Sequence, residues 1–367
     1  MKIAIAINTS WNIYNFRKGL IHKLLERGDS VVAIAPKDEY TDKLVDLGCS
    51  FRHIDVKASG LNPLEEFRFL LAFKKILKEE KPDVLLTYTI KPNIYGSIAA
   101  KSFNIPCICN VSGLGTVFLW KGSVKTIAVG LYNYAFSRTS WIFFQNGDDQ
   151  KDFLEAVNID PGKTDLLPGS GVNTEIFKPV KVDRNPKPVF LVIARLLIDK
   201  GIYEYIEAIK ILHKKGVNAE FRLIGGLDES HSRSVKKAEL AEWIDQGLID
   251  YTPHLTDVRD AIALADVMVL PSYREGTPRT LLEGAAMGKP LIATDVPGCK
   301  HVLIDGENGF LCKVKSPADL AAKMKLFLAL NENERAVMSQ NARKSVIERF
   351  DENLVIDKYL GKIDELS

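Results

Sequence analysis

Short runs of consecutive apolar residues alternate along the chain with longer segments in which apolar residues recur every three or four positions. The short runs predict strands at 2–7, 31–35, 84–87, 107–111, 141–144, 189–193, 221–224, 267–270 and 291–293. Many of them are apolar at every position, which is typical of strands covered on both faces. The longer segments predict helices, most clearly at 15–27, 64–79 and 202–215. The alternation predicts the α/β class, with parallel sheets and right-handed crossovers.

The alternation restarts once, after a segment with the composition of a linker. Three prolines enclose the polar, charged residues 181–185, and such segments connect domains. We therefore expect two doubly wound domains, at 1–178 and 179–367. Two further helical patterns, at 332–349 and 353–364, follow the second series of strands. Periodicity does not decide whether the last helix stays with the second domain or returns to the first.

The composition narrows the function classes. Of the 367 residues, 46% are hydrophobic and 26% are charged, and the net charge is +2. That is typical of a globular protein and argues against a dedicated nucleic-acid binder, which shows a basic excess. Five scattered cysteines are interpreted as reduced core thiols. The first strand is too short for a signal peptide and no apolar run is long enough to span a bilayer, so we expect a cytoplasmic protein.

The charge is unevenly distributed. Residues 84–147 contain no acid, yet they include Lys91, Lys101, Lys121, Lys125 and Arg138 among aromatic and apolar residues. Cations and apolar side chains without acids suit contact with an anionic membrane surface. We therefore expect a peripheral position on the inner face of the plasma membrane. A core helix flanked by solubilising lysines is the alternative.

The loop and helix that follow the strand at 267–270 carry two carboxylates. Pro278 fits the first position of a helix, and Gly276 and Thr277 leave backbone N–H groups where anions bind. Glu275 lies in the loop and Glu283 on the helix, a separation that suits an extended ligand with hydroxyl groups at both ends. The alternative is a loop carboxylate and a surface carboxylate, but the apolar neighbours of Glu283 make a lone exposed charge unexpected there.

Two cations follow the predicted strand at 189–193. Because loops after the strands of an open parallel sheet border the binding crevice, Arg195 and Lys200 are placed to grip a diphosphate, Arg195 bidentately and Lys200 as a point charge. A Lys-Gly pair also often simply ends a turn. A third segment, 169–179, has glycines that allow close backbone approach, with a plain turn as the alternative.

Taken in their order along the chain, these three segments resemble the retaining glycosyltransferases of family 4. They read Gly-Val-Asn-x3-Phe-x-Pro, Arg-x4-Lys-Gly and Glu-x7-Glu, and residues 288–298 and 305–311 are also similar to that family. The resemblance covers nearly the whole chain. It implies the GT-B fold, in which two Rossmann-like domains face each other across a cleft, and a nucleotide-sugar donor, expected to be UDP-linked.

The N-terminal half is similar to the members of that family that build lipid-linked glycans. Residues 8–17, 89–96 and 110–118 carry this similarity. It implies transfer of N-acetylgalactosamine or a related hexose onto an undecaprenyl-diphosphate-linked saccharide, in the assembly of surface glycans or glycoprotein glycans. The motifs do not fix which sugar is moved.

The resemblance also implies roles for single residues. Arg195 and Lys200 match the diphosphate-binding pair, Glu283 the carboxylate that takes the ribose hydroxyls, and Glu275 the one that contacts the donor sugar. The catalytic residues expected on this basis are Arg195, Lys200 and Glu275. The other donor-binding positions are Gly226, Leu255, Gly276, Thr277, Pro278, Arg279 and Glu283. The expected acceptor-binding residues are Asn15, Arg17, Lys91, Asn93, Gly113 and Gly115.

Many members of the family carry a histidine near the donor sugar in the N-terminal domain. None of the six histidines of this chain falls in residues 87–96 or 110–118. Lys91 stands in the first of these segments, and we hypothesise that it binds the donor sugar or the acceptor phosphate. A lysine attracted to the acceptor membrane is an equal alternative.

The expected chemistry needs neither a metal nor a cofactor. No Asp-x-Asp motif ends a strand, and in the front-face mechanism favoured for such enzymes the leaving phosphate oxygen takes the acceptor proton. A sugar-nucleotide epimerase on the same two-domain plan is the alternative function, although the Glu-x7-Glu pattern argues against it. A dinucleotide-binding oxidoreductase would need a Gly-x-Gly-x-x-Gly turn after the first strand, which is absent.

Overall fold

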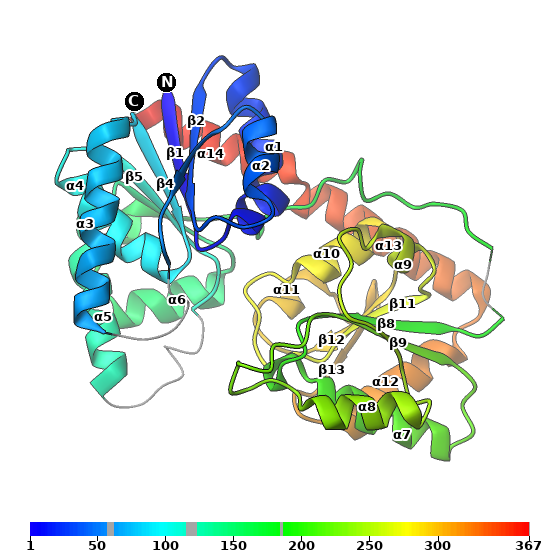
Figure 1. Ribbon diagram of the computed structural model, residues 1–367. Coiled ribbons are helices and arrows are strands. Elements are labelled where there is room, and N and C mark those ends of the chain that lie inside the picture. The colour runs from blue at the N-terminus through cyan, green and yellow to red at the C-terminus, as the bar shows by residue number, and fades with distance from the viewer. Residues whose placement is uncertain (57–61, 115–122, 184–185, 367) are drawn as a thin grey trace. The chain divides into compact units, whose positions relative to one another are not determined.

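The computed structural model describes residues 1–56, 62–114, 123–183 and 186–366 (Figure 1). The chain forms two compact units. Unit 1 comprises Met1–Ser170 and Glu352–Ser367, and unit 2 comprises Gly171–Asp351. The expected boundary at 178/179 therefore falls inside unit 2. The last helix, whose assignment the periodicity left open, lies with unit 1.

Unit 1 is built on a parallel sheet of seven strands within the described residues, in the order β3-β2-β1-β4-β5-β6-β7. The strands are β1 (Lys2–Ala6), β2 (Ser30–Ala35), β3 (Ser50–His53), β4 (Val84–Tyr88), β5 (Cys107–Val111), β6 (Trp141–Phe144) and β7 (Thr164–Leu166). The helices are α1 (Ser10–Glu26), α2 (Thr41–Asp46), α3 (Pro63–Glu80), α4 (Ser97–Lys101), α5 (Ser123–Phe136), α6 (Gly147–Ala156) and α14 (Glu352–Leu366), with a π-helical turn η1 (Pro92–Gly96) before α4.

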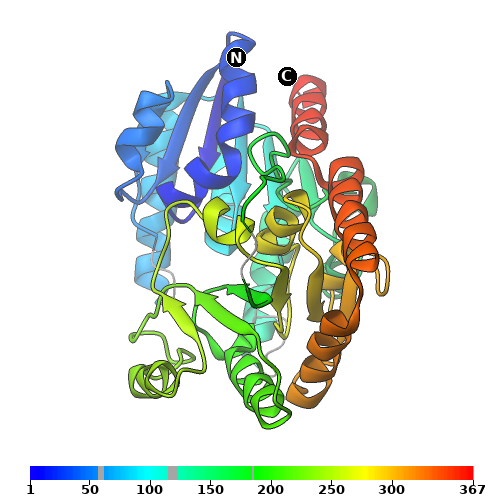
Figure 2. The ribbon, with the colours of Figure 1, turned by 90° about the vertical axis from the view of Figure 1, so that its right-hand side faces the viewer.

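Both faces of this sheet are covered. Helices α3, α4, α5 and α6 enclose one core, and α1, α2 and α14 enclose the other (Figure 1). A single residue, Asp351, separates α14 from the preceding helix, and Figure 2 shows that helix passing directly into α14, drawn in red. Val355, Ile356, Tyr359 and Ile363 of α14 are buried in this second core. The last helix is thus an integral part of unit 1.

Unit 2 has a parallel sheet of six strands within its described residues, in the order β10-β9-β8-β11-β12-β13. The strands are β8 (Val189–Ile193), β9 (Glu220–Ile224), β10 (Asp250–Thr252), β11 (Val267–Leu270), β12 (Leu291–Thr294) and β13 (Gly309–Cys312). The α-helices are α7 (Ile202–Lys214), α8 (Lys237–Asp245), α9 (Arg259–Ala263), α10 (Arg279–Ala286), α11 (Cys299–Val302), α12 (Pro317–Ala329) and α13 (Glu332–Phe350). Helices α7, α8 and α12 pack on one face, and α9, α10, α11 and α13 on the other.

The structure confirms the α/β class with parallel sheets. All nine predicted strands are present, with ends that differ by at most one residue. The strands that the pattern missed are β3, β7, β10 and β13, which form the four edges of the two sheets. Edge strands are covered less completely and carry polar residues, as in the mostly exposed β3. Polar edge residues do not account for the missed strand β13, which reads Gly-Phe-Leu-Cys and is mostly buried.

The five cysteines are buried and free, as expected of core thiols. Among the described residues, no helix combines the length and the apolar character needed to cross a membrane.

Because α14 fills one face of unit 1, we expect Ile363→Ala to lower the free energy of unfolding by about 2–5 kcal/mol, the range for a fully buried aliphatic side chain. Leu354→Ala, at an exposed position of the same helix, should have a much smaller effect. Urea denaturation of both variants measures the difference. Equal effects would mean that α14 does not pack as described.

Candidate functional site

The strand order of unit 2 reverses between β8 and β11. Strand β8 pairs with β9 on one side and with β11 on the other, so the connections from β8 and from β11 leave the sheet in opposite directions. Ligands of open α/β sheets bind in the crevice that this reversal opens at the carboxyl ends of the strands. The loop with Arg195 and Lys200 follows β8, and the loop with Glu275 follows β11. The fold thus brings two of the predicted motifs together.

Backbone contacts hold these two loops against each other. Tyr273 N–H donates to Asp199 O at 2.8 Å, and Ser272 Oγ donates to the same carbonyl at 3.1 Å. Gly201 has φ +71°, and a Cβ there would lie 2.0 Å from Pro271 O. Only glycine permits so close an approach, which explains the Lys-Gly sequence.

The two loops pair the predicted catalytic residues Lys200 and Glu275. Lys200 Nζ lies 2.5 Å from Glu275 Oε1, and the side chains are only 24% and 12% exposed. Partial burial strengthens such a pair relative to one in water. Arg195, by contrast, is exposed and forms no ion pair with the described residues. One cation of the predicted diphosphate grip is therefore fixed in place, and the other is open to solvent.

Glu283 occupies a buried position on α10. Arg279 Nε donates to Glu283 Oε1 at 3.0 Å, and the Glu283 side chain is 12% exposed. Burial raises the pKa of Glu283, and the neighbouring Arg279 offsets this only in part. Arg279, expected in the donor loop, thus orients Glu283. Pro278 is the residue before the helix rather than its first residue, so the backbone N–H of Arg279 is the first of the helix.

Glycines shape the remaining donor positions. At the end of β9, a Cβ on Gly225 would lie 1.7 Å from Ala194 O, whereas Gly226 borders open space. Leu255 packs partly buried against the core. A Cβ on Gly298 would lie 2.3 Å from Gly276 O, so this glycine allows the loop after β12 to support the Glu275 loop. The sequence alone assigned no function to Gly298, because the residue that it contacts, Gly276, is distant in the chain.

The third predicted motif, residues 169–179, makes hydrogen bonds with helix α13. Gly171 lies at the division between the units, and Val172 N–H donates to Phe350 O at 2.9 Å. Arg343 of α13 donates to Phe177 O at 3.1 Å and to Thr174 O at 3.2 Å. The segment is therefore fastened to α13 by hydrogen bonds near the middle and at the end of that helix.

The expected acceptor residues lie in unit 1, where the strand order reverses between β1 and β4. Arg17 lies over the ring of Tyr88 at 4.1 Å, and Asn93 Nδ2 donates to Asn110 O at 2.8 Å. Asn15 donates its side-chain amide to the backbone of its own helix, and Gly113 is half-buried after β5. Gly115 lies outside the described residues.

Lys91 is directed to helix α3. Its Nζ lies 2.5 Å from Glu66 Oε1, with both side chains largely buried. Glu66 also receives a hydrogen bond from Tyr95, whose pKa is raised by burial and by this carboxylate. A binding role for Lys91 stays a prediction, and it would require the ammonium to serve a ligand in addition to Glu66.

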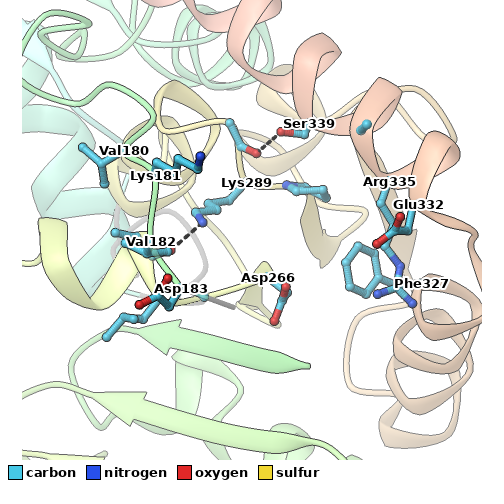
Figure 3. Close-up of a pocket in the computed structure, with 16 residues that line it drawn as sticks. Val180, Lys181, Val182, Asp183, Asp266, Lys289, Phe327, Glu332, Arg335 and Ser339 are labelled. Atoms are coloured by element: carbon cyan, nitrogen blue, oxygen red, sulfur yellow. Dashed lines mark hydrogen bonds between the residues drawn. The ribbon is translucent and has the colours of Figure 1, made fainter. Parts of the chain in front are cut away.

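A separate cavity of about 420 Å³ lies on unit 2 (Figure 3). Asp266 and Pro290, which line it, directly precede β11 and β12, so the cavity is at the amino ends of the strands. Lys289 projects along it and donates to Ala263 O at 2.7 Å, and burial lowers the pKa of this lysine. The cavity is at the wrong end of the sheet to hold the ligand of the Lys200 and Glu275 loops.

In the part of the chain that the structure describes, no three His, Cys, Asp or Glu side chains gather closely enough to form a metal site.

Two doubly wound parallel α/β units are the architecture of the GT-B class of glycosyltransferase. The chain belongs to that enzyme family: residues 173–345 match the model of glycosyl transferases group 1, and residues 2–146 match that of glycosyl transferase 4-like proteins. The predicted glycosyltransferase family, fold class and enzyme class are thereby confirmed, while retention of configuration stays a prediction.

Characterised relatives fit this assignment. The chain is 30% identical, over 100% of its length and 99% of the relative's, to the N,N'-diacetylbacillosaminyl-diphospho-undecaprenol alpha-1,3-N-acetylgalactosaminyltransferase of Campylobacter jejuni. It is 25% identical to the UDP-Gal:alpha-D-GlcNAc-diphosphoundecaprenol alpha-1,3-galactosyltransferase of Escherichia coli, over 84% of this chain and 80% of that one. These matches give no support to the epimerase alternative.

Solved structures show the same fold. A glycosyltransferase from Rickettsia africae superimposes with a TM-score of 0.82 at 20% identity, covering 100% of this chain and 98% of the other. HepE of Anabaena, solved with UDP and glucose, gives 0.81 at 18% identity, with 100% of both chains covered.

The raised pKa of Glu283 makes the stability of unit 2 depend on pH in a definite direction. Below the ordinary value of 4.5 the side chain is protonated in both states. As the pH rises through the folded pKa, the folded state must give up a proton that it holds more tightly than the unfolded chain. We therefore expect wild-type protein to lose stability relative to Glu283→Gln, whose amide does not titrate, as the pH rises above the ordinary value of 4.5. Urea denaturation at several pH values measures this, and a difference that is constant or grows would contradict the burial argument.

Proposed function

We propose that this glycosyltransferase moves N-acetylgalactosamine or a related hexose from a UDP-sugar onto an undecaprenyl-diphosphate-linked saccharide, with retention of the anomeric configuration. The observation that carries the proposal is the 30% identity over the whole of both chains with the Campylobacter enzyme whose name states such an acceptor and sugar. The E. coli relative, whose name also states a UDP-linked donor and a diphosphoundecaprenol acceptor, supports the same chemistry.

The donor loops of unit 2 suit this reaction. An acceptor hydroxyl attacks the anomeric carbon, the bond from that carbon to the phosphate oxygen breaks, and the departing oxygen takes the acceptor proton. Negative charge grows on the diphosphate as the bond breaks, and Arg195 and Lys200 would stabilise it. Glu275 would bind the donor sugar and hold Lys200 in place, 2.5 Å away. Glu283, fixed by Arg279, would accept hydrogen bonds from the ribose hydroxyls. The leaving phosphate serves as the base, and no metal ion is needed.

A donor and acceptor panel tests the proposed function. The purified protein is incubated with UDP-N-acetylgalactosamine, UDP-N-acetylglucosamine or UDP-galactose and an undecaprenyl-diphosphate-linked saccharide, with and without EDTA. We expect release of UDP and an α-linked product by mass spectrometry and NMR, at a rate that EDTA leaves unchanged. If UDP release is no faster with acceptor than without it for any donor, the acceptor assignment is wrong.

Removing either cation of the proposed donor site should lower the rate of the chemical step. We expect Arg195→Met and Lys200→Met each to lower kcat by about 100- to 1000-fold, the usual cost of removing one transition-state charge donor. Lys210→Met is the matched control, because Lys210 also pairs with a glutamate, Glu207 at 2.7 Å, but on the exposed surface of α7. Steady-state UDP release measures all three. A Lys200→Met enzyme with the kcat of the control would remove Lys200 from the mechanism.

We also propose that unit 1 lies on the membrane that holds the acceptor lipid. Helix α3 carries Leu64, Phe67 and Leu71, which are between 49% and 68% exposed, and their spacing places them on one face of the helix. Exposed cations, among them Lys75 and Lys78, continue the same stripe toward its end. An apolar stripe flanked by cations fits an anionic lipid surface.

Helix α5, inside the acid-free segment, adds to this surface. It exposes Ile127 and Tyr134, and Arg138 lies over the ring of Tyr134 at 4.4 Å. Helices α3 and α5 both pack on α4 and η1. Lys121, expected to contribute, lies outside the described residues, as does the side chain of Lys125.

Replacing the three apolar side chains of α3 should therefore weaken membrane binding. We expect a variant with Leu64→Ser, Phe67→Ser and Leu71→Ser to bind vesicles of anionic phospholipid about 100-fold more weakly, because each side chain contributes about 1 kcal/mol by partial burial in lipid. Val337→Ser, at an equally exposed apolar position on α13, is the control. Vesicle sedimentation measures the affinities, and unchanged binding of the triple variant would exclude α3 as the contact.

A further inference from the structure

The strand-order reversal of unit 1 holds a buried cation that has no anionic partner in the described part of the chain. Arg17, on α1, is only 5% exposed. Its guanidinium lies over the ring of Tyr88, the last residue of β4, and Nη1 donates to Phe16 O at 3.2 Å. The Nε–H is buried and has no acceptor. No carboxylate among the described residues pairs with this side chain.

Two other cations of unit 1, in contrast to Arg17, each have a carboxylate partner. Lys91 has Glu66 beside it, and Lys2, although partly exposed, has Glu80. Leaving a buried charge without a partner is strongly destabilising. The ring of Tyr88 offsets some of that cost, because its face attracts a cation, but a ring supplies no hydrogen-bond acceptor for Nε. Arg17 is therefore suited to an anion that arrives from outside the protein.

The loop after β4 contains further unpaired polar atoms. Thr89 has φ +66°, a left-handed conformation that is strained for a β-branched residue, and its Oγ1 is buried without a partner. Asn93, 2% exposed, uses its Nδ2 on Asn110 O, which leaves Oδ1 buried and unpaired. It lies in the π-helical turn η1, a rare geometry that is frequent at functional sites.

These groups belong to one connected cluster. Arg17 lies on the ring of Tyr88, whose centroid is 6.0 Å from that of Tyr359 on α14. Tyr359 Oη accepts a hydrogen bond from Asn110 Nδ2 at 2.8 Å. Asn110 O in turn accepts the hydrogen bond from Asn93. One chain of contacts thus links Arg17 on α1 to Asn93 in η1 by way of α14, and Thr89 directly follows Tyr88 in the sequence.

We propose that this cluster binds the junction between the diphosphate and the first sugar of the acceptor, which deepens the proposed function and rests on it. The charge of the diphosphate matches Arg17, and Thr89 Oγ1 can donate to a phosphate oxygen. A diphosphate has no hydrogen-bond donor at neutral pH, so the acceptor atom Asn93 Oδ1 is matched instead by a hydroxyl or acetamido N–H of the adjoining sugar. A ligand in which a phosphate adjoins a sugar therefore offers a complementary partner to each of the three unpaired atoms.

A pair of acceptors that differ only in charge tests this site. One carries the saccharide on a short prenyl diphosphate, and the other carries the same saccharide on an uncharged alkyl chain. We expect Arg17→Gln to raise the KM of the diphosphate acceptor by about 10- to 100-fold, the equivalent of one charge-assisted hydrogen bond, and to change the KM of the uncharged acceptor less than about twofold. Asn93→Ala should weaken both acceptors equally. Lys18→Gln, at an exposed cation next to Arg17 on α1, should change neither.

Binding of farnesyl diphosphate, measured by calorimetry with UDP saturating the donor site, separates this inference from the proposed function. Wild-type protein should bind it, and Arg17→Gln should bind it at least about tenfold more weakly, whether or not any sugar is transferred. If Arg17→Gln is unstable, Arg17→Lys, which keeps the charge but not the planar fork, should show an intermediate affinity. Equal losses for both acceptors, or farnesyl diphosphate binding that is independent of Arg17, would show that Arg17 only holds α1 on the sheet. Diphosphate binding that depends on Arg17 without sugar transfer would instead overturn the proposed function alone.

Discussion

Right-handed crossovers on both faces of a parallel sheet force the chain to reverse its strand order once, and two neighbouring strands then send their loops in opposite directions. Most of the chemistry of this protein depends on that constraint. In unit 2 the reversal brings Lys200 to Glu275 from loops far apart in the sequence. In unit 1 it places Arg17 over the end of β4. The proposed donor residues lie in loops that the strand order itself brings together, so the topology positions these side chains.

The two reversals differ in how their charges are balanced. In unit 2 the buried carboxylate Glu283 has Arg279 beside it, and Lys200 has Glu275. These groups are held in position before any ligand arrives, which reduces the reorganisation that catalysis requires. In unit 1 no described carboxylate pairs with Arg17, and the proposed acceptor diphosphate would supply the missing negative charge. The charged groups at the reversal of unit 2 are thus paired within the protein, whereas Arg17 at the reversal of unit 1 is proposed to pair with a ligand.

The sequence predicted the inner strands and the donor motifs because both depend on local patterns. Strand β4 is buried on both faces and has a continuous apolar run, whereas the edge strand β3 is mostly exposed and has no such run. Partners separated by long stretches of chain left no local signal. The contact of Gly298 with the Glu275 loop, the pairing of Lys91 with Glu66 and the anchoring of α13 by residues 172–177 are all of this kind. The strain at Thr89 also depends on tertiary structure, because threonine itself prefers extended conformations.

The return of α14 to unit 1 has a consequence for how the protein is made. Unit 2 is inserted in the sequence of unit 1, and Tyr359, which joins Tyr88 to Asn110, is synthesised only after all of unit 2. Domains generally fold as they leave the ribosome, beginning from the N-terminus. Here one face of the N-terminal sheet stays only partly covered, by α1 and α2, until the entire second unit has been translated. A chain released early would therefore hold a finished donor unit beside an incomplete partner, with the hydrophobic surface that normally receives α14 open to aggregation.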